Sequence, residues 1–244
     1  MRRNHLSIAS KVERRILRSK NPGIAWTMHS FSDLPPGAVA RILSRLCAEG
    51  IITRARKGIY YRPVETIFGT SVPNPVTVAE AAAKIKGRKI LVSGYTAYNA
   101  LGLTTQIAGK TTLATDRFIC SSSLRNNKVR TVTRPIYSSM EPAERAVLDA
   151  LRDINRIADT TPKEIIERIR QLISSDRLSF DQLARFAIRG EPPRVRALLG
   201  AIGEQIKAPS EILMLLHRTL NVTTIFKIRL DDSLPSAHNW RITA

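Results

Sequence analysis

The pattern of apolar positions predicts three helices in the first fifty residues. One spans about 6–18, a brief one covers 28–34 after Thr27, and a third begins near Pro36 and ends at Gly50. Gly50 suits a helix end because glycine tolerates the left-handed conformation. The first and third helices each have an apolar face at helical spacing, formed by Ile8, Val12 and Ile16, and by Val39, Ile42, Leu43 and Leu46.

A two-stranded hairpin is predicted directly after the third helix. Ile52 and Arg54 alternate over the first strand, a turn follows at 56–58, and the second strand is formed by the β-favouring residues at 59–61. With a short strand at 24–26, the order helix, strand, helix, helix, hairpin is that of a winged helix-turn-helix. The third helix would then enter the DNA major groove, and the basic hairpin would be the wing that holds phosphates.

Eight residues are predicted to contact DNA in this arrangement. Arginine bonded to guanine is the commonest specific contact, so the exposed arginines of the third helix are expected at base edges, with a serine between them. The hairpin cations are expected on phosphates, and two hydroxyls near the brief helix on the DNA backbone. In that order the residues are Arg41, Arg45 and Ser44, then Arg54, Arg56 and Lys57, then Thr27 and Ser30.

The strong excess of positive charge is the most unusual feature of the composition. The 244 residues include 39 Lys and Arg against 20 Asp and Glu, a net charge of +19. Within residues 1–62, thirteen basic side chains stand against three acidic ones, a net +10. Such an excess favours a polyanionic partner, whether DNA, RNA or an anionic membrane surface, and it coincides with the predicted wing and helix.

The rest of the chain reads as one mixed α/β domain with a helical C-terminal half. Helices are predicted over 77–86 and 94–103, and strands over 89–92, 110–115, 118–122 and 129–136. From Met140 five helices follow, over 142–155, 161–174, 179–188, 192–206 and 209–220. A late strand at 222–230 is expected to rejoin the middle sheet. We therefore predict an α+β chain with a winged helix-turn-helix domain at 1–62 and a second domain at 63–244, with a subdivision near 140 left open.

No catalytic or metal-binding pattern is present in the sequence. The four histidines are scattered, and neither a Walker A loop nor a GxGxxG motif occurs. No acidic residue stands two positions before a lysine, and Asp116 is the sole acid of the strands around 110–136. Two-metal chemistry needs several convergent carboxylates. We expect no enzyme activity, no metal and no cofactor.

The cysteines and the apolar runs indicate where in the cell the protein is located. Cys47 and Cys120 have no paired spacing, which favours a reduced compartment over a disulfide framework or a zinc site. The longest aliphatic run, 212–216, is too short to span a bilayer. We expect a cytoplasmic protein without a membrane partner.

Two blocks of the sequence carry a resemblance to a known family. RILSRLCAEGIITRARKGIYYRP at 41–63 and SGYTAYNALGLTTQIAGKTTLATD at 93–116 resemble the AbiEi-type antitoxins, the regulators of bacterial type IV toxin-antitoxin pairs. The resemblance implies repression through inverted repeats in the chain's own promoter, which is double-stranded DNA, and neutralisation of a co-encoded nucleotidyltransferase toxin. It points to four positions of the second block, Gly94, Asn99, Gly102 and Gln106.

Three alternatives stay open at this point. The segment 93–106 also fits a small-residue helix packed on a sheet, with Asn99 capping a turn. RNA binding is an alternative function, although single-stranded RNA readers expose stacking aromatics and aromatics are only 5% of this chain. An atypical metal-dependent nuclease is a further one, and magnesium-dependent cleavage of DNA would reveal it.

Overall fold

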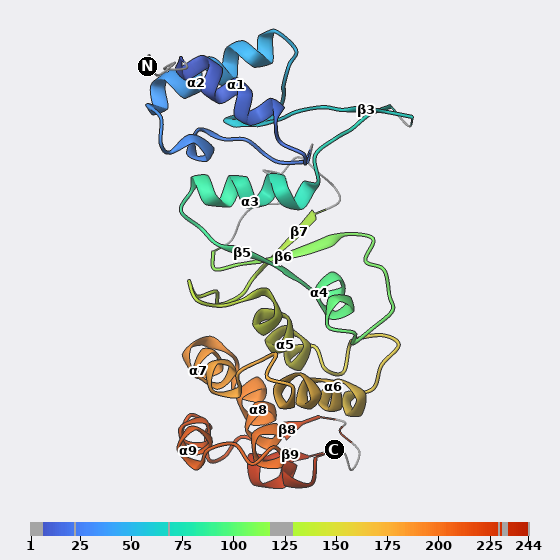
Figure 1. Cartoon of the computed structure of the whole chain (residues 1–244). Helices are drawn as coiled ribbons and strands as arrows, with labels where there is room; N and C mark the ends of the chain where they lie inside the picture. The colour runs from blue at the N-terminus through green and yellow to red at the C-terminus, as the bar shows by residue number, and fades with distance from the viewer. Residues whose placement is uncertain are drawn as a thin grey trace. The chain divides into compact units, whose positions relative to one another are not determined.

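The computed structural model describes residues 7–21, 23–67, 69–117, 129–228, 230 and 234–243. The fold is mixed α+β, with helices and several small sheets (Figure 1). The described residues form two compact units, the first comprising essentially residues 7–89 and the second essentially residues 90–117 and 130–243. Within the described ranges no helix is long and apolar enough to cross a membrane.

The first unit contains the elements expected from the N-terminal pattern. Its first three helical segments match the predicted ones in place, and its hairpin follows the third. A second small hairpin and a further helix, coloured cyan to green in Figure 1, complete it. The elements are α1 (Ile8–Leu17), η1 (Met28–Phe31), α2 (Pro36–Ala48), β1 (Thr53–Arg56), β2 (Ile59–Tyr61), β3 (Glu65–Thr66), β4 (Gly69–Thr70) and α3 (Pro75–Ile85).

A single apolar cluster holds α1, η1, α2 and the β1–β2 hairpin together. It consists of Val12, Ile16, Trp26, Phe31, Val39, Leu43, Leu46, Ile52 and Tyr60. The strand predicted at 24–26 is reduced to one bridge, in which Trp26 and Tyr60 exchange both backbone hydrogen bonds at 2.7 and 2.9 Å. This bridge ties the hairpin to the segment before η1. The half-buried Cys47, a free thiol, packs against the same cluster, while Cys120 lies outside the described residues.

Polar side chains cap the first turns of α1 and α3. The Ser7 hydroxyl accepts the backbone N–H of Ser10 at the start of α1. The Asn74 side chain accepts the N–H of Val76 at the start of α3, and Pro75 follows at the first helical position. Both caps satisfy a backbone donor that the helix itself leaves unpaired, and Asn74 places the start of α3 two residues before the predicted 77.

The division into compact units falls at Lys89, whereas the sequence predicts a domain boundary at residue 62. The hairpin β3–β4 and helix α3 therefore group with the first unit. The apolar cluster described above nevertheless lies wholly within residues 12–60. Whether 1–62 and 63–244 fold separately stays a prediction.

The second unit begins with a three-stranded sheet of order β5-β6-β7 and a short helix. The bounds are β5 (Ile90–Ser93), α4 (Tyr95–Ala100), β6 (Thr111–Thr115) and β7 (Val129–Thr133). β5 and β6 run antiparallel, with Ile90 opposite Thr115 and Ser93 opposite Thr112. The predicted strand at 118–122 lies outside the described residues.

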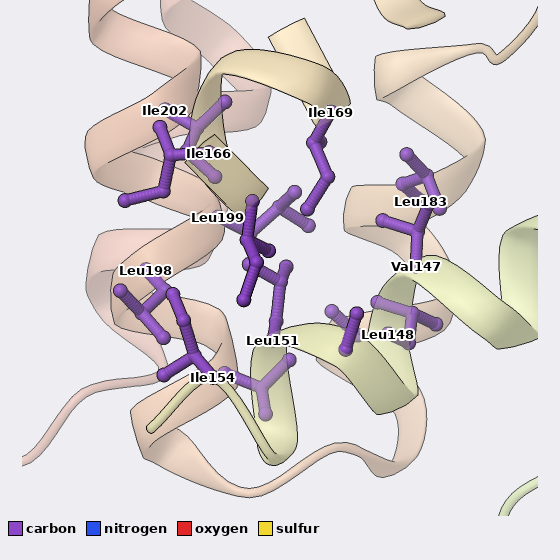
Figure 2. Close-up of a cluster of buried hydrophobic side chains, with 14 of the residues drawn as sticks. Val147, Leu148, Leu151, Ile154, Ile166, Ile169, Leu183, Leu198, Leu199 and Ile202 are labelled. Atoms are coloured by element: carbon purple, nitrogen blue, oxygen red, sulfur yellow. The ribbon is translucent and has the colours of Figure 1, made fainter. Parts of the chain in front are cut away.

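Five helices follow, close to their predicted positions, and they bury most of the apolar core of the unit. They are α5 (Pro142–Arg152), α6 (Pro162–Ser174), α7 (Phe180–Gly190), α8 (Pro193–Gln205) and α9 (Ser210–Arg218). Figure 2 shows side chains from four of them converging, with Leu148 and Leu151 from α5, Ile166 from α6, Leu183 from α7 and Leu199 from α8. Helix α8 is buried almost all round, which fits its place between neighbouring helices.

In the part of 222–230 that the structure describes, the late strand does not join the middle sheet, so that prediction is wrong. β8 (Phe226–Lys227) pairs in parallel with β9 (Ile242–Thr243) at the end of the chain. Between them, η4 (Pro235–Trp240) places Trp240 in the core against α8. Among the described residues the pairing joins Phe226 to Ile242 and Lys227 to Thr243, and the sequence pattern did not reveal this partner. The pairing of the late strand with the middle sheet was the reason for treating 63–244 as one domain, and the structure does not supply it.

Candidate nucleic-acid interface

Helix α2 has two faces of different character. Val39, Leu43 and Leu46 point into the core and are at most 1% exposed. The outer face combines small side chains with two arginines, in the order Gly37, Ala40, Arg41, Ser44, Arg45 and Ala48, all exposed. Since residues three and four apart are neighbours on a helix, these side chains form one continuous strip. The small residues leave the helix backbone approachable between the two arginines.

The arginines of this strip are weakly engaged within the protein. The Arg41 Nε donates to the carbonyl of Gly37 at 3.3 Å, one turn earlier on the same helix. Arg45 lies 3.4 Å from Glu49, and both side chains are about half exposed, 52% and 46%. An exposed pair of this kind contributes about 0–1 kcal/mol. Both guanidinium groups can therefore bind an external acceptor with little loss of internal interaction energy.

The β1–β2 hairpin combines a buried strand with exposed cations. Ile59, Tyr60 and Tyr61 of β2 are 1%, 7% and 9% exposed, so packing holds this strand in place. Gly58 has a φ of +76°, which allows the tight turn after Lys57. Arg54 and Lys57 are exposed and Arg56 is partly exposed. The hairpin brings together the three cations that the sequence assigned to it.

Thr27 and Ser30 lie elsewhere, in the cap of η1. Thr27 is only 5% exposed, and its backbone N–H donates to the Ser30 hydroxyl at 3.1 Å. The Ser30 side chain is half-buried. Thr27 and Ser30 thus contact each other within the cap of η1.

A second basic face, on α1, was not among the predicted site residues. Its members lie at helical spacing, and they line an open groove of about 510 Å³ together with Ser19 and Trp26. Arg15 is neutralised by a two-bonded pair with Asp33, at 2.8 and 2.9 Å, which lowers the pKa of the Asp33 carboxyl. Lys11, Arg14 and Arg18 are exposed and have no ion-pair partner within the described part of the chain. Their i, i+3, i+7 spacing was readable from the sequence.

Arg62 connects the end of the hairpin to the end of α1. Its two Nη atoms donate to the backbone carbonyls of Leu17 at 2.6 Å and Ser19 at 3.0 Å. These carbonyls lie at the C-terminus of α1, where helix carbonyls lack an intrahelical donor and a cation is favoured. Arg62 is therefore a structural residue rather than one more free cation.

The block at 93–106 is tied into the second unit by several polar contacts. Gly94 and Gly102 both take positive φ, +65° and +72°, before and after α4. A Cβ on Gly94 would lie 3.1 Å from the Thr112 hydroxyl. The Gln106 amide donates to Asp159 at 2.6 Å. Of the four positions singled out, only Asn99 presents an exposed side chain for which no internal hydrogen bond is seen among the described residues.

Tyr98 anchors the buried side of the same block. Its hydroxyl donates to the Asp153 carboxylate at 2.9 Å, and the ring is 2% exposed. Burial and the negative charges of Asp153 and Asp149 raise the pKa of the phenol well above its ordinary value. Tyr98 is therefore a neutral hydrogen-bond donor under ordinary conditions. These contacts fit the packing interpretation of the block, with the backbone N–H of Gly102 donating to the Asn99 carbonyl.

A buried charge network next to this block had no sequence signal. Arg145 is fully buried and contacts Glu191 at 2.8 Å and Asp149 at 3.1 Å. Arg134 pairs with Asp149 at 2.9 Å and Arg152 with Glu191 at 2.6 Å. Ser93 donates to Asp149 at 2.5 Å, which connects the network to β5. The partners of Glu191 lie 39 and 46 positions away in the sequence, too far for any local pattern to predict.

Other surfaces of the second unit offer less chemistry. An apolar groove of about 380 Å³ lies between α4 and α5, lined mainly by small side chains including Ala97, Ala100, Ala143 and Ala146. Among the residues that the structure describes, no group of three or more His, Cys, Asp or Glu side chains is placed to hold a metal ion.

Comparison with known proteins places the chain in a family but gives no activity. Residues 11–176 match the family described as "Family of unknown function (DUF6088)". No curated protein matches the sequence. Among solved structures, the RV2827C protein from Mycobacterium tuberculosis is 14% identical, with a TM-score of 0.48 over 89% of this chain and 83% of that one. That similarity is too low to inform residue roles.

Proposed function

The chain belongs to the DUF6088 family, and we propose that it is a non-enzymatic, sequence-specific DNA-binding protein with a winged helix-turn-helix at its N-terminus. In this proposal α2 is the recognition helix and the β1–β2 hairpin is the wing. The observation that carries it is the outer strip of α2, where Arg41 and Arg45 stand among small residues beside a hairpin bearing three cations.

The dimensions of the strip suit the DNA major groove. The groove is about 12 Å wide and admits one α-helix. Arg41 and Arg45 lie one turn apart, about 6 Å along the helix axis, which corresponds to roughly two base-pair steps of 3.4 Å. Both arginines can therefore reach guanine edges near one another, with Ser44 between them. The small Gly37, Ala40 and Ala48 allow the helix to lie deep in the groove.

The hairpin cations would act on phosphates. Arg54 and Lys57 are exposed at the wing and Arg56 partly so, and phosphate contacts fix orientation without reading sequence. Three such contacts give a dependence of log affinity on log salt with a slope of about −2.7. Thr27 is left out of this interface because it is buried.

Burial of the aromatics favours duplex DNA over single-stranded RNA. Readers of single strands stack bases on exposed aromatic rings. Tyr60 and Tyr61, the sole aromatic pair flanked by basic residues, are 7% and 9% exposed, and Tyr60 belongs to the core cluster. Direct competition between a selected duplex and single-stranded RNA separates the two functions.

The antitoxin role is the part of the proposal that rests on resemblance. We propose that the chain represses its own operon through inverted repeats and counters a co-encoded nucleotidyltransferase toxin in the cytoplasm. For the second task the exposed Asn99 and the neighbouring groove between α4 and α5 are the surface to test, because Gly94, Gly102 and Gln106 are engaged internally. Growth of cells that co-express the toxin with an Asn99→Ala variant measures this role.

The decisive experiment for DNA binding is selection from a random duplex library followed by fluorescence anisotropy. We expect an enriched motif whose affinity exceeds that of random duplex by at least about 10³-fold. Arg54→Ala should weaken both duplexes alike, whereas Arg45→Ala should remove most of the discrimination at one base position. Enrichment of no motif, or preferential binding of single-stranded RNA, would contradict the proposal.

A further inference from the structure

Helix α9 exposes an apolar strip that its own unit does not cover. Ile212 and Leu216 are 3% and 0% exposed and hold the helix against the core. On the opposite side Met214 and Leu215 are 50% and 45% exposed. Large apolar side chains exposed side by side on a helix are typical of an interaction surface. The buried side fixes α9 firmly, so the exposed side is a rigid platform.

Two opposite charges flank this apolar pair symmetrically. Glu211 precedes Met214 by three residues, and Arg218 follows Leu215 by three. At about 100° per residue, all four side chains fall on one face of the helix. Glu211 and Arg218 are exposed, and neither has an ion-pair partner within the residues described. The strip Glu211–Met214–Leu215–Arg218 thus has the order acid, apolar, apolar, base.

This order is complementary to itself in an antiparallel helix pair. Glu211 and Arg218 are about 10.5 Å apart along the axis, and their midpoint falls between Met214 and Leu215. A two-fold axis at that midpoint places Glu211 opposite Arg218 of the second copy, and Met214 opposite Leu215. An isologous contact of this kind requires one self-complementary patch, and α9 has one.

We propose that α9 is a homodimer interface, in which two copies of the chain pair their α9 helices antiparallel through this strip. Val222 and Ile225, in the segment directly after α9, are 75% and 63% exposed and supply further apolar side chains. A pairing of two helices of nine residues alone would bury less than a standard interface. The proposal concerns the second unit only, and its test uses no DNA, so it stands or falls independently of the proposed function.

Sedimentation analysis of the full chain over a wide micromolar range tests the proposal. We expect a monomer–dimer equilibrium that Arg218→Glu and Glu211→Arg each weaken by about tenfold or more, because each substitution acts twice in a two-fold dimer. The double charge swap Glu211→Arg/Arg218→Glu should restore the wild-type dissociation constant to within about threefold, since it re-creates both pairs. Arg177→Glu, an equal charge change at an exposed arginine that, like Arg218, has no ion-pair partner among the described residues, is the matched control and should leave the equilibrium unchanged.

Leu215→Ser supplies a second test that leaves the charges at the ends of α9 intact. It should weaken the dimer as strongly as either charge reversal. In a Trp26→Phe background the Trp240 fluorescence, which reports on the ring contacting His217 of α9, should stay as it is without the Leu215 substitution. A wild-type chain that is monomeric throughout the range would overturn the proposal. A dimer that survives the single substitutions, or that the charge swap does not restore, would overturn it equally.

Discussion

Replacing Glu191 by Gln removes one charge from the buried network while keeping the shape of the side chain. Glu191 follows directly after α7, and its side chain is fully buried. One carboxylate oxygen accepts Arg145 at 2.8 Å and the other accepts Arg152 at 2.6 Å. Glutamine offers a single acceptor oxygen in the same place, so one of the two arginines loses its bond.

The expected loss follows from the burial of Arg145. Its side chain is 0% exposed, so water cannot replace the missing partner, and Asp149 and the Pro135 carbonyl remain as its neighbours. Removing one member of a buried ion pair costs about 3–5 kcal/mol. Because glutamine still accepts one hydrogen bond and Arg152 is 25% exposed, we expect the low end, about 3 kcal/mol.

Urea unfolding followed by tryptophan fluorescence measures this change. The chain has one tryptophan in the core of each unit, Trp26 and Trp240, so a Trp26→Phe background reports on the second unit alone. Glu167→Gln is the matched control, because Glu167 pairs with Arg170 at 2.9 Å with both side chains substantially exposed, 52% and 37%. That exposed pair is worth about 0–1 kcal/mol.

The comparison between the two variants tests whether the buried network depends on each of its charges. We expect Glu191→Gln to lower the free energy of unfolding by at least about 2 kcal/mol more than Glu167→Gln. Equal losses in the two variants would refute the reasoning that the network is a desolvated cluster whose charges depend on one another.

Three further predictions concern packing, pH and separability. Gly200→Ala should destabilise the second unit by about 1–3 kcal/mol in the same assay despite alanine's better helix propensity, because a Cβ there would lie 2.1 Å from the Trp240 ring; an unchanged midpoint would contradict the close contact. Glu164 accepts the Thr161 backbone N–H, which lowers its pKa, so its stabilisation should be present above the ordinary carboxyl pKa and disappear as the pH falls through the folded value; unfolding of wild type and Glu164→Gln at several pH values should converge in acid. A chain ending at Pro63 should fold and bind duplex DNA, since the first core cluster lies within 12–60; circular dichroism and anisotropy of this fragment test it.

Local patterns predicted most helices because each carries its own signal. Pro36 at a first helical position, Gly50 with its φ of +74° and the Thr161–Glu164 capping box all act within a few residues of one another. The strip of α2 and the hairpin cations followed from the same local reasoning. The basic face of α1 has an equally local signal, the i, i+3, i+7 spacing of Lys11, Arg14 and Arg18, although it was not among the predicted site residues.

Long-range partners were beyond the reach of the sequence pattern. The strand at 222–230 has the alternation of a strand but nothing in it names its partner, and β8 pairs with residues at 242–243 instead of the middle sheet. The buried network joins Arg145 to Glu191, which are 46 positions apart. The sequence around each residue gives no sign that its charge is buried. Thr27 is polar and precedes a short helix, which locally predicts exposure, but tertiary packing buries it to 5%.

The central claim is that α2 recognises bases while the hairpin contacts phosphates, and one measurement tests it most directly. Anisotropy titrations of Arg41→Ala and Lys57→Ala on a selected duplex and its single-base variants, at several salt concentrations, compare the two elements. We predict that Arg41→Ala costs about 1–3 kcal/mol on the selected duplex and relaxes preference at one base position, and that Lys57→Ala weakens all duplexes alike and lowers the salt slope by about one unit. If Lys57→Ala changed the sequence preference while Arg41→Ala did not, the assignment of recognition helix and wing would be contradicted.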